Sequence, residues 1–193
     1  ISEPERVFAV HKGYADAGAE FITANTFGAN SLKYDNVDEL VKAGVALAKK
    51  AGKYVALDIG PTGKLLKPMG DLEFERAVEL FAEVVRAGKD GSDVAIIETM
   101  SDMYELKAAV IAVKENSDLP IITSMIFDES GRLLTGGDVK SAVAMLEGLR
   151  VDAIGFNCGL GPKQMIPLVK ELRECTSLPI LVMPNAGLPE SVD

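Results

Sequence analysis

The sequence predicts an α/β protein of the (β/α)8 TIM-barrel class, incomplete here, with about six parallel strands in one domain over residues 1–193. Six short runs are rich in Ile and Val and hardly alternate with polar residues, as expected for strands buried on both faces of a parallel sheet. An amphipathic stretch separates each run from the next, and this strand–helix repeat predicts βαβ units. The runs span residues 20–27, 54–61, 94–100, 120–127, 152–158 and 179–187.

The stretches between these runs carry helix-start signals. Ser2 followed by Glu5 resembles a capping box, and Asn36 is placed to cap a helix over residues 37–51. Ser101 is expected to cap a helix over 102–115, and Asp138 one over 139–149. Further helices are expected over residues 73–86 and 163–174.

A doubly wound sheet has the same repeat, but no G-x-G-x-x-G motif opens the first helix, which weakens a dinucleotide-binding version. A complete barrel has eight strands, and this sequence begins in a helix with no strand before it. We therefore expect one strand to be missing at the front and one at the back. Strands left with open edges predict self-association.

Composition excludes several classes of function. The net charge is −9, and no basic cluster is present, so nucleic acid and acidic membranes are not expected partners. No apolar run is long enough to span a membrane, and residues 1–5 lack the features of a signal peptide. Two cysteines are too few for a disulfide framework, which favours a cytoplasmic protein.

Polar residues follow the apolar runs, at the end of a barrel where active sites lie. A ring of such residues predicts a site for a small polar substrate. The alternative is that strand ends need polar groups only to satisfy loops and helix caps. The ring comprises Asn25-Thr26, Asp58, Glu98-Thr99, Thr123-Ser124, Asn157-Cys158 and Asn185.

Glu98 ends an apolar strand, where a carboxylate is costly to bury unless it is paired. A substrate ammonium group would pair it, and so would a Lys, an Arg or a helix N-terminus. Cys158 taken alone is more typical of a small buried apolar side chain. The only histidine, His11, lies within the first expected helix, away from strand ends, so a Ser/His/Asp triad is not supported.

Taken together, six motifs resemble the homocysteine S-methyltransferase family, most closely the homocysteine-binding domain found in cobalamin-dependent methionine synthase. They occur in the family's order along the whole sequence, and together they are highly specific. The motifs are Ala24-Asn25-Thr26-Phe27-Gly28-Ala29-Asn30, Asp58-Ile59-Gly60-Pro61-Thr62-Gly63, Ile97-Glu98-Thr99-Met100-Ser101-Asp102, Phe127-Asp128-Glu129-Ser130-Gly131-Arg132, Asn157-Cys158-Gly159-Leu160-Gly161-Pro162 and Pro184-Asn185-Ala186-Gly187-Leu188-Pro189.

The resemblance implies a (β/α)8 barrel that transfers a methyl group to the sulfur of homocysteine, giving methionine. It implies a zinc ion held by three cysteine thiolates, because metal binding converts the substrate thiol into the reactive thiolate. By motif, Cys158 is one metal ligand, Glu98 receives the substrate amino group, and Asn185 belongs to the substrate site. Asp58 and Ser124 are placed at the same pocket, and no residue is assigned a catalytic role.

The resemblance also implies a methylcobalamin donor on a separate module, recharged by a folate module. The family's first strand would precede Ile1, and its Gly-Gly-Cys-Cys pair would follow Asp193. This chain is therefore expected to be inactive alone, with an incomplete zinc site. Two alternatives stay open: a stand-alone relative that uses a sulfonium donor such as S-methylmethionine, and a non-catalytic barrel remnant.

Overall fold

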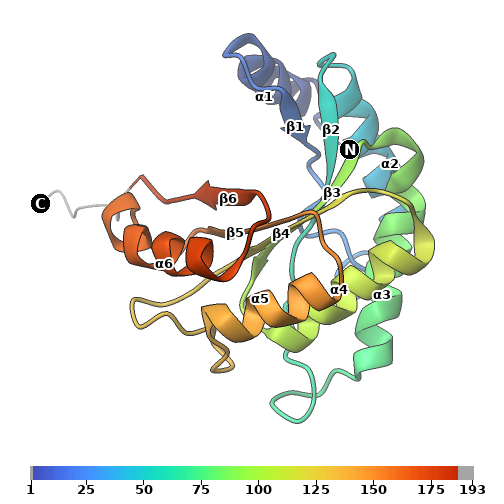
Figure 1. The fold of residues 1–193 in the computed structure, drawn as a ribbon. Helices are drawn as coiled ribbons and strands as arrows, with labels where there is room; N and C mark the ends of the chain where they lie inside the picture. Colours follow the sequence, from blue (N-terminus) through green and yellow to red (C-terminus); the bar gives the residue numbers. More distant parts are fainter. Residues whose placement is uncertain (1, 187–193) are drawn as a thin grey trace, which may run out of the picture.

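The computed structural model describes residues 2–186 and shows a parallel sheet that curls into a half-barrel with helices on its outer side (Figure 1). The strands follow one another in sequence order, β1-β2-β3-β4-β5-β6, and every neighbouring pair is parallel. The predicted fold class is thus confirmed. The elements are α1 (Pro4–Asp16), β1 (Phe21–Thr23), α2 (Val37–Lys49), β2 (Tyr54–Ile59), α3 (Phe74–Gly88), η1 (Lys89–Gly91), β3 (Val94–Met100), α4 (Met103–Asn116), β4 (Ile121–Met125), α5 (Val139–Gly148), β5 (Ala153–Asn157), α6 (Pro162–Cys175) and β6 (Ile180–Met183).

Two hydrophobic clusters lie on opposite faces of this sheet. The larger one fills the space between the sheet and the outer helices, and includes Leu57, Ile97 and Ile154 from the strands. The smaller one lies on the inner face, where Ala56 and Ile96 belong to its buried centre. Burial on both faces is why these strands are continuous apolar runs rather than alternating ones.

Helix capping differs from the sequence expectations at two places. Helix α1 begins at Pro4 with Glu3 as its N-cap, so Ser2 does not cap it. Helix α4 is capped by Asp102 rather than Ser101: its carboxylate accepts a hydrogen bond from the Tyr104 N–H at 2.8 Å. A carboxylate reaches the first-turn N–H groups as well as a hydroxyl does, and its charge also suits the helix dipole.

The two other predicted N-cap residues occupy their expected positions. Asp138 caps α5 by accepting from the Ser141 N–H at 2.9 Å. Asn36 is the N-cap residue of α2, but its side chain makes no capping bond and donates instead to the Glu39 carboxylate at 3.3 Å.

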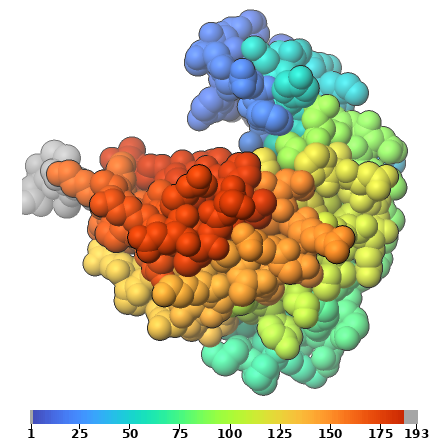
Figure 2. Space-filling view, in the orientation of Figure 1, coloured from blue at the N-terminus to red at the C-terminus, as the bar shows by residue number. Residues whose placement is uncertain are grey.

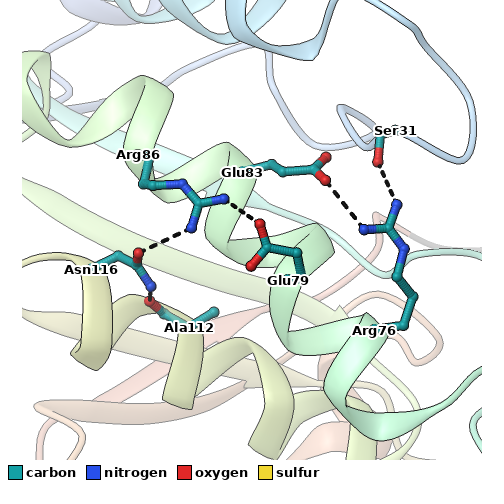
Figure 3. A network of polar contacts seen from close by, with 7 residues as sticks. All are labelled: Ser31, Arg76, Glu79, Glu83, Arg86, Ala112 and Asn116. Carbon is teal, nitrogen blue, oxygen red and sulfur yellow. Dashed lines mark hydrogen bonds and ion pairs between the residues drawn. The ribbon is translucent and has the colours of Figure 1, made fainter.

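Charged side chains join α3 to its neighbours on the outer surface (Figure 3). Arg86 donates to Glu79 on the same helix at 2.5 Å and to the Asn116 amide at the end of α4 at 3.2 Å. Arg76 pairs with Glu83 at 3.4 Å. Exposed pairs of this kind each contribute about 1 kcal/mol or less, so packing of the helices on the sheet holds this layer together.

The sheet has two outer strands, and each is paired on one side only within residues 2–186. In β1 the Ala24 N–H donates to Ala56 and the Glu20 carbonyl accepts from Tyr54, so the backbone groups of Phe21 and Thr23 point to the free edge. A hollow separates this N-terminal part from β6 (Figure 2). Within residues 2–186, no helix has both the length and the apolar character needed to cross a membrane.

These free edges predict that the 193-residue chain self-associates, because unpaired N–H and C=O groups on an edge strand pair with another chain. Light scattering across a dilution series is expected to show a mean mass that rises with concentration. A Thr23→Pro variant removes one free-edge N–H and should shift this rise to about tenfold higher concentration, or ~1.4 kcal/mol. A clean monomer at all concentrations would contradict the prediction.

Candidate functional site

The carboxyl ends of the six strands meet at one end of the half-barrel, because all the strands are parallel. Asp58 and Glu98 lie in β2 and β3, and Ser124 lies in β4. Cys158 directly follows β5, and Asn185 follows β6. The five residues singled out from the sequence are therefore distributed over neighbouring strand ends.

Asp58 and Glu98 share the inner face of the sheet. The register pairs Asp58 with Ile96, which belongs to the inner cluster, and Glu98 lies two residues beyond Ile96 on the same face. Asp58 is only 5% exposed, and its Oδ1 has no hydrogen-bond partner among the described residues. The two carboxyl groups are thus close neighbours in a poorly solvated setting.

Burial of these carboxyl groups raises both of their pKa values. The pKa of Asp58 rises to about 8, first because it is buried and second because the negative charge of Glu98 is near. Burial also raises the pKa of Glu98. Within residues 2–186 neither carboxylate forms an ion pair. Two desolvated acids without a cation form a site that favours a positively charged ligand group.

His11 lies in α1 and lines a cavity of about 540 Å³ together with Asp58. It is 6% exposed, its Nε2 has no hydrogen-bond partner among the described residues, and burial lowers its pKa. The expectation that His11 lies away from strand ends is therefore wrong. Side chains of α1 and β1 border this cavity together with Asp58 of β2, a grouping that the sequence periodicity does not reveal. Other residues around this cavity include Tyr14, Phe21, Asn25 and Met183.

The loop after β2 is fixed against two neighbours. Gly60 donates its N–H to the Phe27 carbonyl, and a side chain at this position would meet that carbonyl at 2.5 Å, so only glycine fits. Thr62 donates its N–H and its hydroxyl to the Glu105 carboxylate at 2.7 and 2.6 Å. These contacts hold the loop that begins after Ile59, the neighbour of Asp58.

A hydrogen-bond network joins β3, β4 and β5 near their carboxyl ends. The Asn157 carboxamide oxygen accepts from the Ser124 hydroxyl at 2.5 Å and from the Thr99 N–H at 3.0 Å. Its amide group donates to the Thr99 hydroxyl at 2.7 Å and to the Cys158 Sγ at 3.4 Å. Sequence reasoning placed Asn157 in the polar ring but assigned it no role; its position before Cys158 was the available signal.

Cys158 stands at a sharp turn of the backbone. Its φ is 55° and that of Gly159 is 64°, and its side chain is half-buried. The Asn185 N–H donates to the Leu160 carbonyl at 3.1 Å, so the segment after β6 is bonded to the turn after Cys158. Cys175 is the last residue of α6, before β6 begins, and therefore lies at the opposite end of the sheet.

A zinc site of the kind implied by the resemblance needs several thiolate or imidazole ligands in one place. In the part of the chain that the structure describes, no three His, Cys, Asp or Glu side chains form such a group. Cys158 is the one thiol at this end of the half-barrel, since the sequence has two cysteines and the other is Cys175. Residues 2–186 alone therefore do not fit a closed zinc site.

Sequence and structure together define an incomplete parallel α/β barrel with polar residues gathered at its strand ends. The model of the family described as "Homocysteine S-methyltransferase" matches residues 1–193, and the chain belongs to that family. Over 97% of its length the chain is 30% identical to the methionine synthases of Mycobacterium leprae (strain TN) and Mycobacterium tuberculosis (strain ATCC 25618 / H37Rv). It spans only 17% of the length of either relative.

Solved structures of the Escherichia coli homocysteine methyltransferase MmuM resemble the chain closely. The metallated form superposes with a TM-score of 0.86 at 24% identity, covering 97% of this chain and 74% of MmuM. The apo form gives a TM-score of 0.83 at 25% identity over the same shares of the two chains. This likeness extends the family assignment to the three-dimensional fold.

Proposed function

We propose that this chain forms part of a homocysteine S-methyltransferase domain whose strand ends bind homocysteine. The observation that carries the proposal is the desolvated pair Asp58 and Glu98, without a cation of their own, at the end of the sheet where Cys158 also lies. The ammonium group of homocysteine would supply the missing charge. Ser124 and Asn185 would complete the pocket, and the substrate sulfur would lie toward Cys158.

Zinc enters this proposal only with further ligands from the parent polypeptide, because this chain supplies Cys158 alone at that end. When bound, the metal would keep the substrate sulfur deprotonated. The residues described here would bind and orient the substrate. We also propose that the chain is a single barrel domain and that it acts in the cytoplasm, which the two free cysteines support.

For the methyl donor we propose methylcobalamin, carried on a separate module that a folate module recharges. The identity to two methionine synthases supports this choice. The alternative donor is a sulfonium compound such as S-methylmethionine. The similarity of the fold to MmuM, a homocysteine methyltransferase, is the reason to retain this alternative.

The test uses the longest natural polypeptide that contains this sequence. Incubated with homocysteine, it is expected to form methionine from methylcobalamin and not from S-methylmethionine. Methionine from S-methylmethionine alone would replace the proposal with the alternative donor. No methionine from either donor would favour a non-catalytic barrel remnant.

A separate prediction concerns the 193-residue chain by itself. After dialysis against zinc-free buffer, metal analysis is expected to find well below one zinc per chain, because one thiolate does not close a tetrahedral site. The chain should also give no measurable methyl transfer to homocysteine. Tight, stoichiometric zinc in this chain would show that other residues complete the site.

A further inference from the structure

The side chain of Asn157 has every hydrogen-bonding position in use. A carboxamide offers two acceptor and two donor positions, and here they engage Thr99 twice, Ser124 once and the Cys158 sulfur once. Asn157 is 4% exposed and Ser124 is fully buried. A buried, fully satisfied polar group of this kind fixes the positions of its partners, because losing any bond leaves an unpaired group behind.

Thr99 is the first of the two partners that matter. Its φ is 64°, a left-handed conformation that is a genuine outlier for a β-branched residue. The pairing of β3 with β4 shifts register between Ile97 and Met100, around this residue. Asn157 holds both the N–H and the hydroxyl of Thr99. Thr99 directly follows Glu98, so the two bonds that hold Thr99 also anchor the backbone next to Glu98.

Cys158 is the second partner. It also has a positive φ, of 55°, and its Sγ accepts from the Asn157 amide. One carboxamide therefore contacts the residue after Glu98 on β3 and the sulfur after β5. Both unusual backbone turns at this end of the sheet adjoin the same side chain.

We infer that Asn157 is a positioning residue that sets the Glu98 end of the pocket and the Cys158 sulfur relative to each other. The inference rests on the proposed function, in which Glu98 binds the amino group of homocysteine and Cys158 lies near the sulfur of homocysteine. Asn157 acts through Thr99 and Cys158 and touches no substrate itself. A merely structural asparagine would support the sheet without affecting the placement of either group.

The first arm of the test measures Cys158 in the 193-residue chain, independently of any methyl transfer. In a Cys175→Ser background, the rate of reaction with a disulfide reagent reports how firmly the Cys158 sulfur is held. Asn157→Ala is expected to raise this rate about tenfold, the size of effect that follows from the loss of one hydrogen bond to the sulfur. Ser124→Ala, the matched control, removes a different bond to the same carboxamide and should change the rate by about twofold or less.

If Asn157→Ala does not fold, as judged by circular dichroism, Asn157→Ser decides the matter. Its shorter side chain keeps a hydroxyl but cannot reach the sulfur, so the same rise in rate is expected. Equal rates in the wild type and the Asn157 variant, or equal changes in the Asn157 and Ser124 variants, would overturn the inference.

The second arm uses the longest natural polypeptide and separates KM from kcat. Asn157→Ala is expected to raise the KM for homocysteine about tenfold. Adding Thr99→Gly should bring KM back to within about threefold of wild type, because glycine adopts a positive φ without being held there. Unchanged KM with a lower kcat, or no rescue by glycine, would mean that Asn157 only supports the fold. Absence of methyl transfer in the wild type would count against the proposed function, and the thiol arm would still decide the role of Asn157.

Discussion

A Cys158→Ser variant of the longest natural polypeptide is expected to lose its bound zinc and at least about a thousandfold in the rate of methionine formation, ~4 kcal/mol of transition-state stabilisation. The physical reason is that a serine hydroxyl stays protonated near neutral pH and is a poor zinc ligand, whereas a thiol readily gives up its proton to the metal. The sulfur of Cys158 already lies at the strand end beside the proposed pocket.

Cys175→Ser is the matched control for this experiment. Cys175 is also half-buried, but it ends α6 at the opposite end of the sheet. The control should keep its zinc and most of its activity, within about threefold of wild type. Metal analysis and initial rates on the same preparations give both answers. Loss of zinc from both variants, or from neither, would show that Cys158 is not a metal ligand.

The second large effect concerns Asp58 and the pH dependence of stability. The pKa of Asp58 is raised from 3.8 to about 8 in the folded chain. Between these two pH values the folded state therefore holds a proton that the unfolded state has already released. The stability associated with this proton is fully present below about pH 4 and is lost as pH rises toward 8. From about pH 5 to about pH 8 this loss amounts to about 4 kcal/mol, at 1.36 kcal/mol for each pKa unit.

Asp58→Asn should remove most of this loss, because an amide of the same shape stays neutral at every pH. Urea unfolding at low protein concentration is expected to give similar stabilities for both chains near pH 5 and a more stable variant near pH 8. Asp128→Asn is the control, because the pKa of Asp128 is shifted in the opposite direction. Hydrogen bonds from Ser130 lower this pKa, so the contribution of Asp128 to stability is constant from about pH 5 to about pH 8. A wild-type stability that stays flat from about pH 5 to about pH 8 would contradict the assignment.

Much of this fold follows from local sequence. The six strands and their parallel order were predictable because buried parallel strands must be continuous apolar runs, and short crossover helices place successive strands side by side. The predicted strand over residues 20–27 was too long, because only Phe21–Thr23 pairs as a strand before the chain turns away. Such ends depend on where the neighbouring strand stops, which a single run of residues does not encode.

The sequence by itself also determined which polar residues follow the strands, since polar side chains interrupt the apolar pattern at those points. Only the tertiary structure decided how they are used. The cavity shared by His11 and Asp58, the raised pKa of Asp58 beside Glu98, and the bonds of Asn157 to Thr99 and Ser124 all join residues far apart in the chain. Their strength depends on burial and on strand register, and both arise only when separate strands pack together.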